Sequence, residues 1–229
     1  MQKRSMIPRK KALECANIFH IYCEQTKMWQ STKWLGIPCF KFPFDAWVLQ
    51  EIIYDIKPDI VIETGTAYGG SAVFIASILE LLDYGKVITI DINNKYKTNI
   101  DNDIAKYLWD TRVFPIIGDS ISNEIIDQVH DHIYYDAKCL VLLDSWHRKE
   151  HVLKELELYS EFVSLDSYII VEDTHVNGNP VPWKWGAGPM EAVDEFLVTN
   201  KHFKSDLDRE KFFITCNPKG YLKRTNYKK

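Results

Sequence analysis

Five short apolar runs, each ending in an acidic residue, constrain the fold of this 229-residue chain more than any other feature. The runs are DIVIE (59–63), KVITID (86–91), VFPIIGD (113–119), CLVLLD (139–144) and SYIIVED (167–173). Stretches with helical spacing separate them, such as the one that carries Val152, Leu156 and Tyr159. Continuous apolar strands that alternate with helices are typical of a parallel sheet covered on both faces. We therefore predict an α/β fold.

The two ends of the chain differ from this repeating pattern. Residues 1–50 are predicted to be a helical extension with a proline- and aromatic-rich loop, WLGIPCFKFPF, which either braces the fold or walls a ligand pocket. Residues 51–229 are predicted to be one compact unit. Within it a helix is expected over 93–109, and Pro218 and Gly220 indicate a turn before a late antiparallel strand.

Composition excludes several classes of protein. Hydrophobic residues make up 46% and charged residues 26%, which is ordinary for a soluble globular protein. A net charge of −4 provides no general basic field, so we expect no nucleic acid partner. No apolar run approaches the roughly 18 residues of a membrane span, and no apolar stretch follows the basic start, so we expect a cytoplasmic protein. The basic ends are either solvated or weakly attracted to anionic membranes. The number of cysteines, five, is odd, and they are scattered along the chain, which predicts reduced thiols.

The loop after the first run, ETGTAYGGSAVF (63–74), has the features of a ligand-binding turn. Gly65 allows a tight turn, and Gly69 and Gly70 allow a ligand to approach the backbone before a helix begins at Ser71. The dinucleotide pattern GxGxxG is matched imperfectly, because Ala67 replaces its middle glycine. The loop is therefore only weak evidence for a pyrophosphate site.

The acids at the strand ends indicate another cofactor. In open α/β sheets, ligands bind at the carboxyl ends of the strands. Glu63 would repel a phosphate but can hold an amino group, Asp91 can accept hydrogen bonds from ribose hydroxyls, and Asp119 can bind an adenine amino group. Amine, ribose and adenine partners together favour S-adenosylmethionine over a dinucleotide.

A second group of acids lies in LLDSWH (142–147) and VEDTH (171–175). If these strands are neighbours, Asp144, Glu172 and Asp173 share a small volume and repel each other unless a cation binds them. Mg²⁺ fits such oxygen ligands, with Mn²⁺ and Ca²⁺ as alternatives. Both Glu172 and Asp173 can be ligands only if the chain leaves its pleat there. His147 is the candidate base, with His175 as its competitor. Trp183 and Trp185 indicate an aromatic lid or a wall of the substrate site.

The combined motifs resemble the cephalosporin hydroxylase family from about Trp34 onward. They are WLGIPCFKFPFDAW, KPDIVIETGTAYGGSA, GDS, LLDSWH, VEDT and NPKGYLKR. The resemblance implies a Rossmann-like class I methyltransferase fold, with a mostly parallel seven-stranded sheet, and kinship with rhamnosyl and macrolide-sugar O-methyltransferases. It implies a Mg²⁺ site at Asp144, Glu172 and Asp173, with His147 as the general base. The residues expected to bind S-adenosylmethionine are Glu63, Thr64, Gly65, Gly69, Gly70, Ser71, Asp91, Asp119 and Ser120.

We therefore expect a Mg²⁺- and S-adenosylmethionine-dependent O-methyltransferase. Its acceptor would be a hydroxyl, of a sugar in a glycan or a natural product, and the enzyme is expected to be a homo-oligomer. A nicotinamide-dependent oxidoreductase is the first alternative, against which Ala67 and Glu63 count. A non-catalytic binding protein on the same fold is the second. The two-histidine, one-carboxylate triad of non-haem iron oxygenases is not recognised in the sequence, so the family name does not establish hydroxylation.

Overall fold

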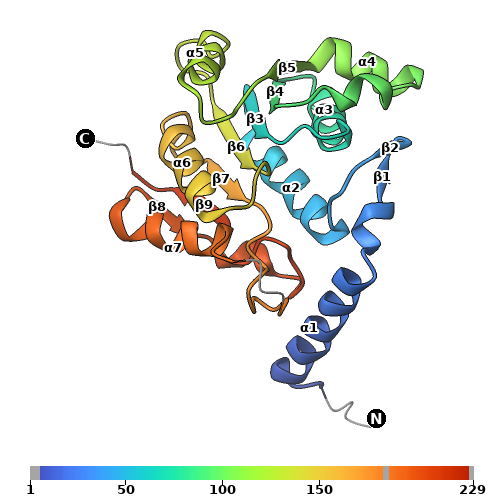
Figure 1. The fold of residues 1–229 in the computed structure, drawn as a ribbon, viewed down its shortest axis with the longest axis vertical. Coiled ribbons are helices and arrows are strands. Elements are labelled where there is room, and N and C mark those ends of the chain that lie inside the picture. The colour runs from blue at the N-terminus through green and yellow to red at the C-terminus, as the bar shows by residue number, and fades with distance from the viewer. Residues whose placement is uncertain (1–5, 183–185, 227–229) are drawn as a thin grey trace.

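The chain forms a seven-stranded sheet between two layers of helices (Figure 1). A computed structural model describes residues 6–182 and 186–226. The strands of this sheet are β3 (Ile60–Thr64), β4 (Lys86–Asp91), β5 (Val113–Ile117), β6 (Cys139–Leu143), β7 (Tyr168–Val171), β8 (Phe203–Ser205) and β9 (Tyr221–Arg224). They lie in the order β5-β4-β3-β6-β7-β9-β8, all parallel except β9, which is antiparallel to both its neighbours. The predicted sheet, including the late antiparallel strand, is confirmed.

Helices cover both faces because the strand side chains are apolar on both sides. The helices that follow the first are α2 (Pro43–Ile56), α3 (Gly70–Leu81), α4 (Asp103–Arg112), α5 (Asn123–Asp131), α6 (Lys149–Tyr159) and α7 (Pro189–Thr199). In β6, Leu140 and Leu142 join the core under α2, α3 and α4, whereas Val141 and Leu143 join the core under α5, α6 and α7. This alternation is that of a strand buried on both faces.

The strand order reverses between β3 and β6, and there the two strands and the loops after them lie unusually close together. The Asp144 N–H donates to the Thr64 carbonyl at 3.0 Å, and the Gly65 N–H donates to the Ile90 carbonyl at 2.7 Å. Gly65 has a φ of +95°, and a Cβ on it would lie 2.0 Å from the Asp144 carbonyl oxygen. Only glycine allows the β3 loop to turn this close to the end of β6.

One predicted helix is wrong in part. The expected helix over 93–109 is a 3-10 turn, η2 (Lys95–Thr98), followed by α4. The Asn102 side chain accepts a hydrogen bond from the Ala105 N–H at 2.9 Å, so α4 begins at Asp103, five residues after the 3-10 turn ends at Thr98. Asparagine at this position caps a new helix rather than continuing an existing one.

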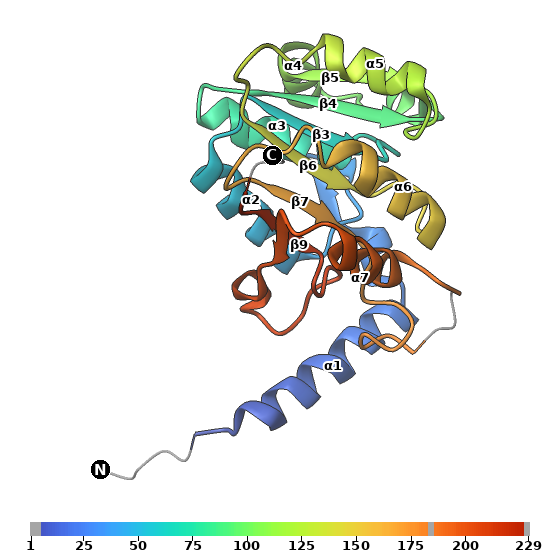
Figure 2. The same ribbon diagram turned by 90° about the vertical axis from the view of Figure 1, so that its left-hand side faces the viewer.

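The N-terminal helix α1 (Arg9–Gln25) projects away from the sheet and its helices (Figures 1 and 2). Its buried residues are His20 and Cys23, near its C-terminal end. The 3-10 turn η1 (Met28–Ser31) and the short hairpin β1 (Lys33–Trp34) and β2 (Ile37–Pro38) lead from α1 into α2. The division into residues 1–50 and 51–229 stays a prediction, and α2 spans that boundary.

Two further predictions concern the whole chain. The five cysteines are free thiols, as expected. Within residues 6–182 and 186–226, no helix combines the length and the apolar character that crossing a bilayer requires.

Gly65→Ala should destabilise the fold far more than a glycine substitution that meets only backbone strain. Gly178 is the matched control, because it has a φ of +98° and no described atom lies within 4 Å of its Cβ position. Strain alone costs about 1–2 kcal/mol, and the clash with the Asp144 carbonyl adds to it at Gly65. Urea denaturation of both variants measures the difference. Equal losses would mean that the contact between the β3 loop and β6 does not constrain the fold.

Candidate active site

A cavity of about 720 Å³ opens at the carboxyl ends of β3, β6 and β7. The loop before α2 forms one wall, through Pro38, Cys39, Phe40, Lys41 and Phe42. The glycine loop after β3, the ends of β6 and β7, and the C-terminal end of α1 form the others. The proline- and aromatic-rich loop therefore walls a pocket, which was one of its two predicted roles.

Glu63 lies beneath the glycine loop and is fully buried in β3. Its Oε2 accepts a hydrogen bond from the Thr89 hydroxyl at 2.6 Å, whereas Oε1 has no hydrogen-bond partner among the described residues. Burial raises the pKa of this carboxyl group, opposed by Lys41 and by the Ser71 and Thr89 hydroxyls. An unpartnered buried carboxylate oxygen fits the amino group of S-adenosylmethionine, which would satisfy it.

The carboxylate of Asp91 is fixed at the end of β4. Its oxygens accept hydrogen bonds from the backbone N–H groups of Ala67 and Asn93, each at 2.8 Å. Ala67 has a φ of +45°, so the loop adopts the left-handed turn even without glycine at this position. Asp119 is exposed after β5, and its carboxylate accepts a hydrogen bond from the Ile121 N–H at 3.2 Å. Both acids lie outside the lining of the large cavity.

Ser120 and Thr64, two of the residues predicted to bind the cofactor, have hydroxyl groups that form hydrogen bonds within the protein. The Ser120 hydroxyl donates to the buried Glu155 of α6 at 2.6 Å, and the Ser145 hydroxyl donates to the same oxygen at 2.7 Å. The Thr64 hydroxyl accepts a hydrogen bond from the Asp144 N–H at 3.3 Å. These contacts hold the ends of β3, β5 and β6 in register beneath the site.

The acids after β6 and β7 meet at His147. The His147 Nε2 lies 3.7 Å from Asp144 Oδ1 and 3.3 Å from Asp173 Oδ2, and one ligand atom of each residue falls within 4.8 Å of the others. Asp173 has a φ of +58°, so the chain leaves its pleat at this residue, two positions after the end of β7. Two carboxylates and an imidazole at this separation fit a divalent cation.

Glu172 lies outside this cluster and contacts Lys41. The Lys41 Nζ donates to Glu172 Oε1 at 2.5 Å and to Asp144 Oδ2 at 3.2 Å. The Lys41 side chain is 3% exposed, so its ammonium is a buried counter-charge between the two acids. All three predicted carboxylates could bind one cation only if the cation replaced the Lys41 ammonium between Glu172 and Asp144.

The electrostatics of the cluster follow from burial and from these pairs. Burial lowers the pKa of Lys41, but Asp144, Glu172 and Glu63 outweigh it and hold that pKa well above its usual value. Burial raises the pKa of Glu172 to about 8 against the opposing effect of Lys41. Burial also acts on Asp173, but His147 and His175 outweigh it and lower the pKa of that carboxyl group. Asp173 is therefore the member of the cluster that most readily stays ionised.

Sequence reasoning missed Lys41. The available signal was a single charged residue inside the otherwise uncharged segment LGIPCFKFPF, since a lysine flanked by aromatic side chains must have a partner if it is buried.

His175, the competing base, has both ring nitrogens engaged, with the Cys216 carbonyl at 3.0 Å and Glu24 at 3.6 Å. Trp183 and Trp185, the predicted lid residues, lie outside the described residues.

The fold, the glycine loop and the strand-end acids define a class I methyltransferase. The sequence profile of the Rhamnosyl O-methyltransferase/CmcI family matches residues 26–225. The chain belongs to this family, and it is an S-adenosylmethionine-dependent O-methyltransferase. The predicted kinship and enzyme class are confirmed, and the oxidoreductase and non-catalytic alternatives are set aside.

Individual relatives agree with this assignment. The chain is 35% identical over 219 residues to the rhamnosyl O-methyltransferase of Mycobacterium bovis (strain BCG / Pasteur 1173P2), an alignment that covers 90% of this chain and 84% of that protein. It is 32% identical over 214 residues to the enzyme of the same name from Mycobacterium leprae (strain TN), covering 90% and 89%. A structure of CmcI with Mg and SAM has the same fold, with a TM-score of 0.63 and 16% identity over 86% of this chain and 78% of that one. An O-methyltransferase from Bacillus cereus in complex with SAH aligns with a TM-score of 0.54 and 16% identity, covering 86% and 83%.

Proposed function

We propose that this enzyme methylates a hydroxyl group of a sugar, a rhamnosyl group above all, with a divalent cation at the carboxyl ends of β6 and β7. The observation that carries the proposal is the cluster of Asp144, His147 and Asp173 in the wall of the large cavity, next to the glycine loop. The rhamnosyl O-methyltransferases that match most of the chain support the choice of acceptor. The acceptor sugar would belong to a glycan or to a natural product.

The methyl donor would lie along the glycine loop, beside the acids at the ends of β3, β4 and β5. Glu63 would accept a hydrogen bond from the amino group through its unpartnered Oε1, and Asp91 would accept from the ribose hydroxyls. The backbone of the glycine loop would contact the cofactor, because Gly65 and Gly70 both line the cavity. Their missing side chains make room for the carbonyl oxygens of Asp144 and Pro38, which hold the loop in place. Ser71, at the start of α3, would bind beside Glu63. Asp119 would contact the adenine amino group.

The acceptor would lie next to the methyl donor, against Asp144 and Asp173 at the ends of β6 and β7. A divalent cation bound there, Mg²⁺ by its preference for carboxylate oxygens, supplies positive charge that makes the acceptor hydroxyl more acidic. His147 would accept the hydroxyl proton at Nε2, and the imidazolium formed would lie next to two carboxylates, which stabilise its charge. Phe40 and Tyr68 line the cavity with their rings edge to face, the ring centroids 5.4 Å apart, and offer an apolar surface for a sugar ring.

Methyl transfer from labelled S-adenosylmethionine tests the proposal directly. Acceptors that carry a terminal rhamnosyl group should be methylated with Mg²⁺ present, and EDTA should abolish the reaction until Mg²⁺ is restored. Acceptors in which another sugar or a phenol replaces the rhamnosyl group are the matched controls. Full turnover in EDTA would contradict the metal site, and transfer to phenols alone would contradict the sugar acceptor.

Substitutions at His147 and Asp144 separate a base from a metal ligand. His147→Ala should keep its affinity for cofactor and Mg²⁺ while losing roughly 10²–10⁴ in turnover, the usual share of general-base catalysis. Asp144→Asn should instead weaken Mg²⁺ binding, so that high Mg²⁺ restores part of its rate.

Initial rates against Mg²⁺ concentration measure these effects for the wild type and both variants. A His147→Ala enzyme with near-native turnover would contradict the base role. A large loss of Mg²⁺ affinity in that variant would make His147 a ligand instead.

A further inference from the structure

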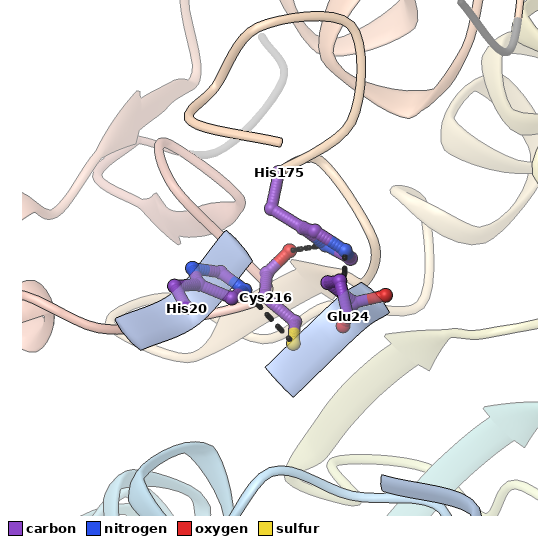
Figure 3. Close-up of side chains that lie close together, drawn as sticks. All are labelled: His20, Glu24, His175 and Cys216. Carbon is purple, nitrogen blue, oxygen red and sulfur yellow. Dashed lines mark hydrogen bonds and ion pairs between the residues drawn. The ribbon is translucent and has the colours of Figure 1, made fainter. Parts of the chain in front are cut away.

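A second cluster of metal-ligating side chains, separate from Asp144, His147 and Asp173, lies in the wall of the same cavity. His20 and Glu24 project from α1, and His175 and Cys216 approach them from the loops after β7 and before β9 (Figure 3). One ligand atom of each residue lies within 4.8 Å of all the others. Two imidazoles, a thiol and a carboxylate form a donor set that suits a borderline-soft metal ion better than a hard one.

The distances in the cluster are close to those of a tetrahedral zinc site. Zinc binds nitrogen, sulfur and oxygen at about 2.0–2.3 Å, so neighbouring ligand atoms lie roughly 3.3–3.7 Å apart. The His20 Nε2 lies 3.9 Å from the Cys216 Sγ, and the His175 Nε2 lies 3.6 Å from the Glu24 Oε1. Small side-chain movements would close the four atoms around one ion.

Hydrogen bonds and ring stacking fix the orientation of three of the proposed ligands, His175, Cys216 and His20. A carbonyl can only accept, so the His175 Nδ1–H donates to the Cys216 carbonyl at 3.0 Å. The other ring nitrogen, Nε2, lies 3.6 Å from Glu24 Oε1 inside the cluster, and it would bind the metal through its lone pair once it has lost its proton. The buried Asp45 accepts a hydrogen bond from the Cys216 N–H at 2.8 Å. His20 is stacked on His175, with ring centroids 5.1 Å apart, and is 1% exposed. Such fixed orientations favour binding because little order is lost when the metal enters.

The position of the cluster suggests what a metal ion would do there. The buried residues of α1 are His20 and Cys23, while large apolar side chains such as Ile18 (68% exposed) and Tyr22 (56% exposed) face away from the body. The end of α1 nevertheless lines the large cavity through Glu24 and Gln25. A helix with so little buried surface needs another interaction to stay in place.

We propose that His20, Glu24, His175 and Cys216 bind one Zn²⁺ ion, which fastens α1 to the wall of the active-site cavity. The Cys216 thiol loses its proton to solvent as it binds, and no electron is transferred. The site is separate from the Asp144 cluster, which contains no sulfur ligand. His175 connects the two sites, because its Nδ1 lies 3.7 Å from Asp173 Oδ1.

Cobalt substitution tests this site in the wild-type protein. Metal-free enzyme titrated with Co²⁺ should develop a thiolate-to-cobalt charge-transfer band and intense visible bands of tetrahedral cobalt, saturating at one equivalent, and Zn²⁺ should remove them. The Asp144 cluster cannot produce the thiolate band. Failure to observe that band in the folded wild-type protein would overturn the proposal.

Variants assign the ligands, with circular dichroism to verify folding. Cys216→Ser should abolish the thiolate band, and His20→Gln should weaken Co²⁺ binding at least tenfold. Cys15→Ser, which removes an exposed thiol of the same helix, is the matched control and should keep the band. Asp144→Asn should keep it as well. A band that persists in folded Cys216→Ser would overturn the assignment.

Limited proteolysis tests the effect on α1. Zn²⁺ should slow cleavage within α1 at least tenfold in the wild type and leave the cleavage rate of His20→Gln unchanged. Equal cleavage of the wild type with and without bound Zn²⁺ would overturn the role of the ion in holding the helix.

Discussion

The contact between Gly65 and the Asp144 carbonyl is the constraint on which the rest of the site depends. It joins the ends of β3 and β6, the two strands at which the strand order of the sheet reverses. Because the loop turns with a left-handed glycine, the glycine loop and Asp144, the first acid of the proposed metal site, end up adjacent. A donor bound by the loop and an acceptor bound by the acids would then meet without any movement of the sheet.

A second constraint is the balance of charge at the ends of β6 and β7. Three carboxylates converge there, and the buried Lys41 ammonium neutralises part of their charge. Lys41 therefore stabilises the protein without a metal ion and competes with one for Glu172 and Asp144. Lys41 contacts Asp144 Oδ2, whereas His147 Nε2 lies 3.7 Å from Asp144 Oδ1 and 3.3 Å from Asp173 Oδ2. A cation could therefore meet Asp144 Oδ1, His147 and Asp173 while Lys41 keeps its contact with the other oxygen of Asp144.

Much of this arrangement could be predicted from the sequence because it depends on local patterns. Apolar runs that end in acids indicate both the strands and the edge of the sheet at which the acids gather. The positions of Glu63, Asp91, Asp144 and Asp173 at or just after the strand ends could therefore be predicted from the sequence, and their roles stay predictions. Lys41 could not be paired in this way, because its partners lie 103 and 131 residues away and only packing brings them together. The same holds for Ser120, whose hydroxyl binds Glu155 of α6, and for the end of α1, whose place beside the cavity follows from the contacts of His20.

Crystals grown with Mn²⁺ and S-adenosylhomocysteine test the central claim most directly, because manganese can be located by its anomalous scattering. The account predicts one strong peak within bonding distance of Asp144 and Asp173, beside a cofactor product held by Glu63 and Asp91. A cofactor product bound elsewhere, or a site without manganese in which the Lys41 ammonium still bridges Asp144 and Glu172, would contradict it.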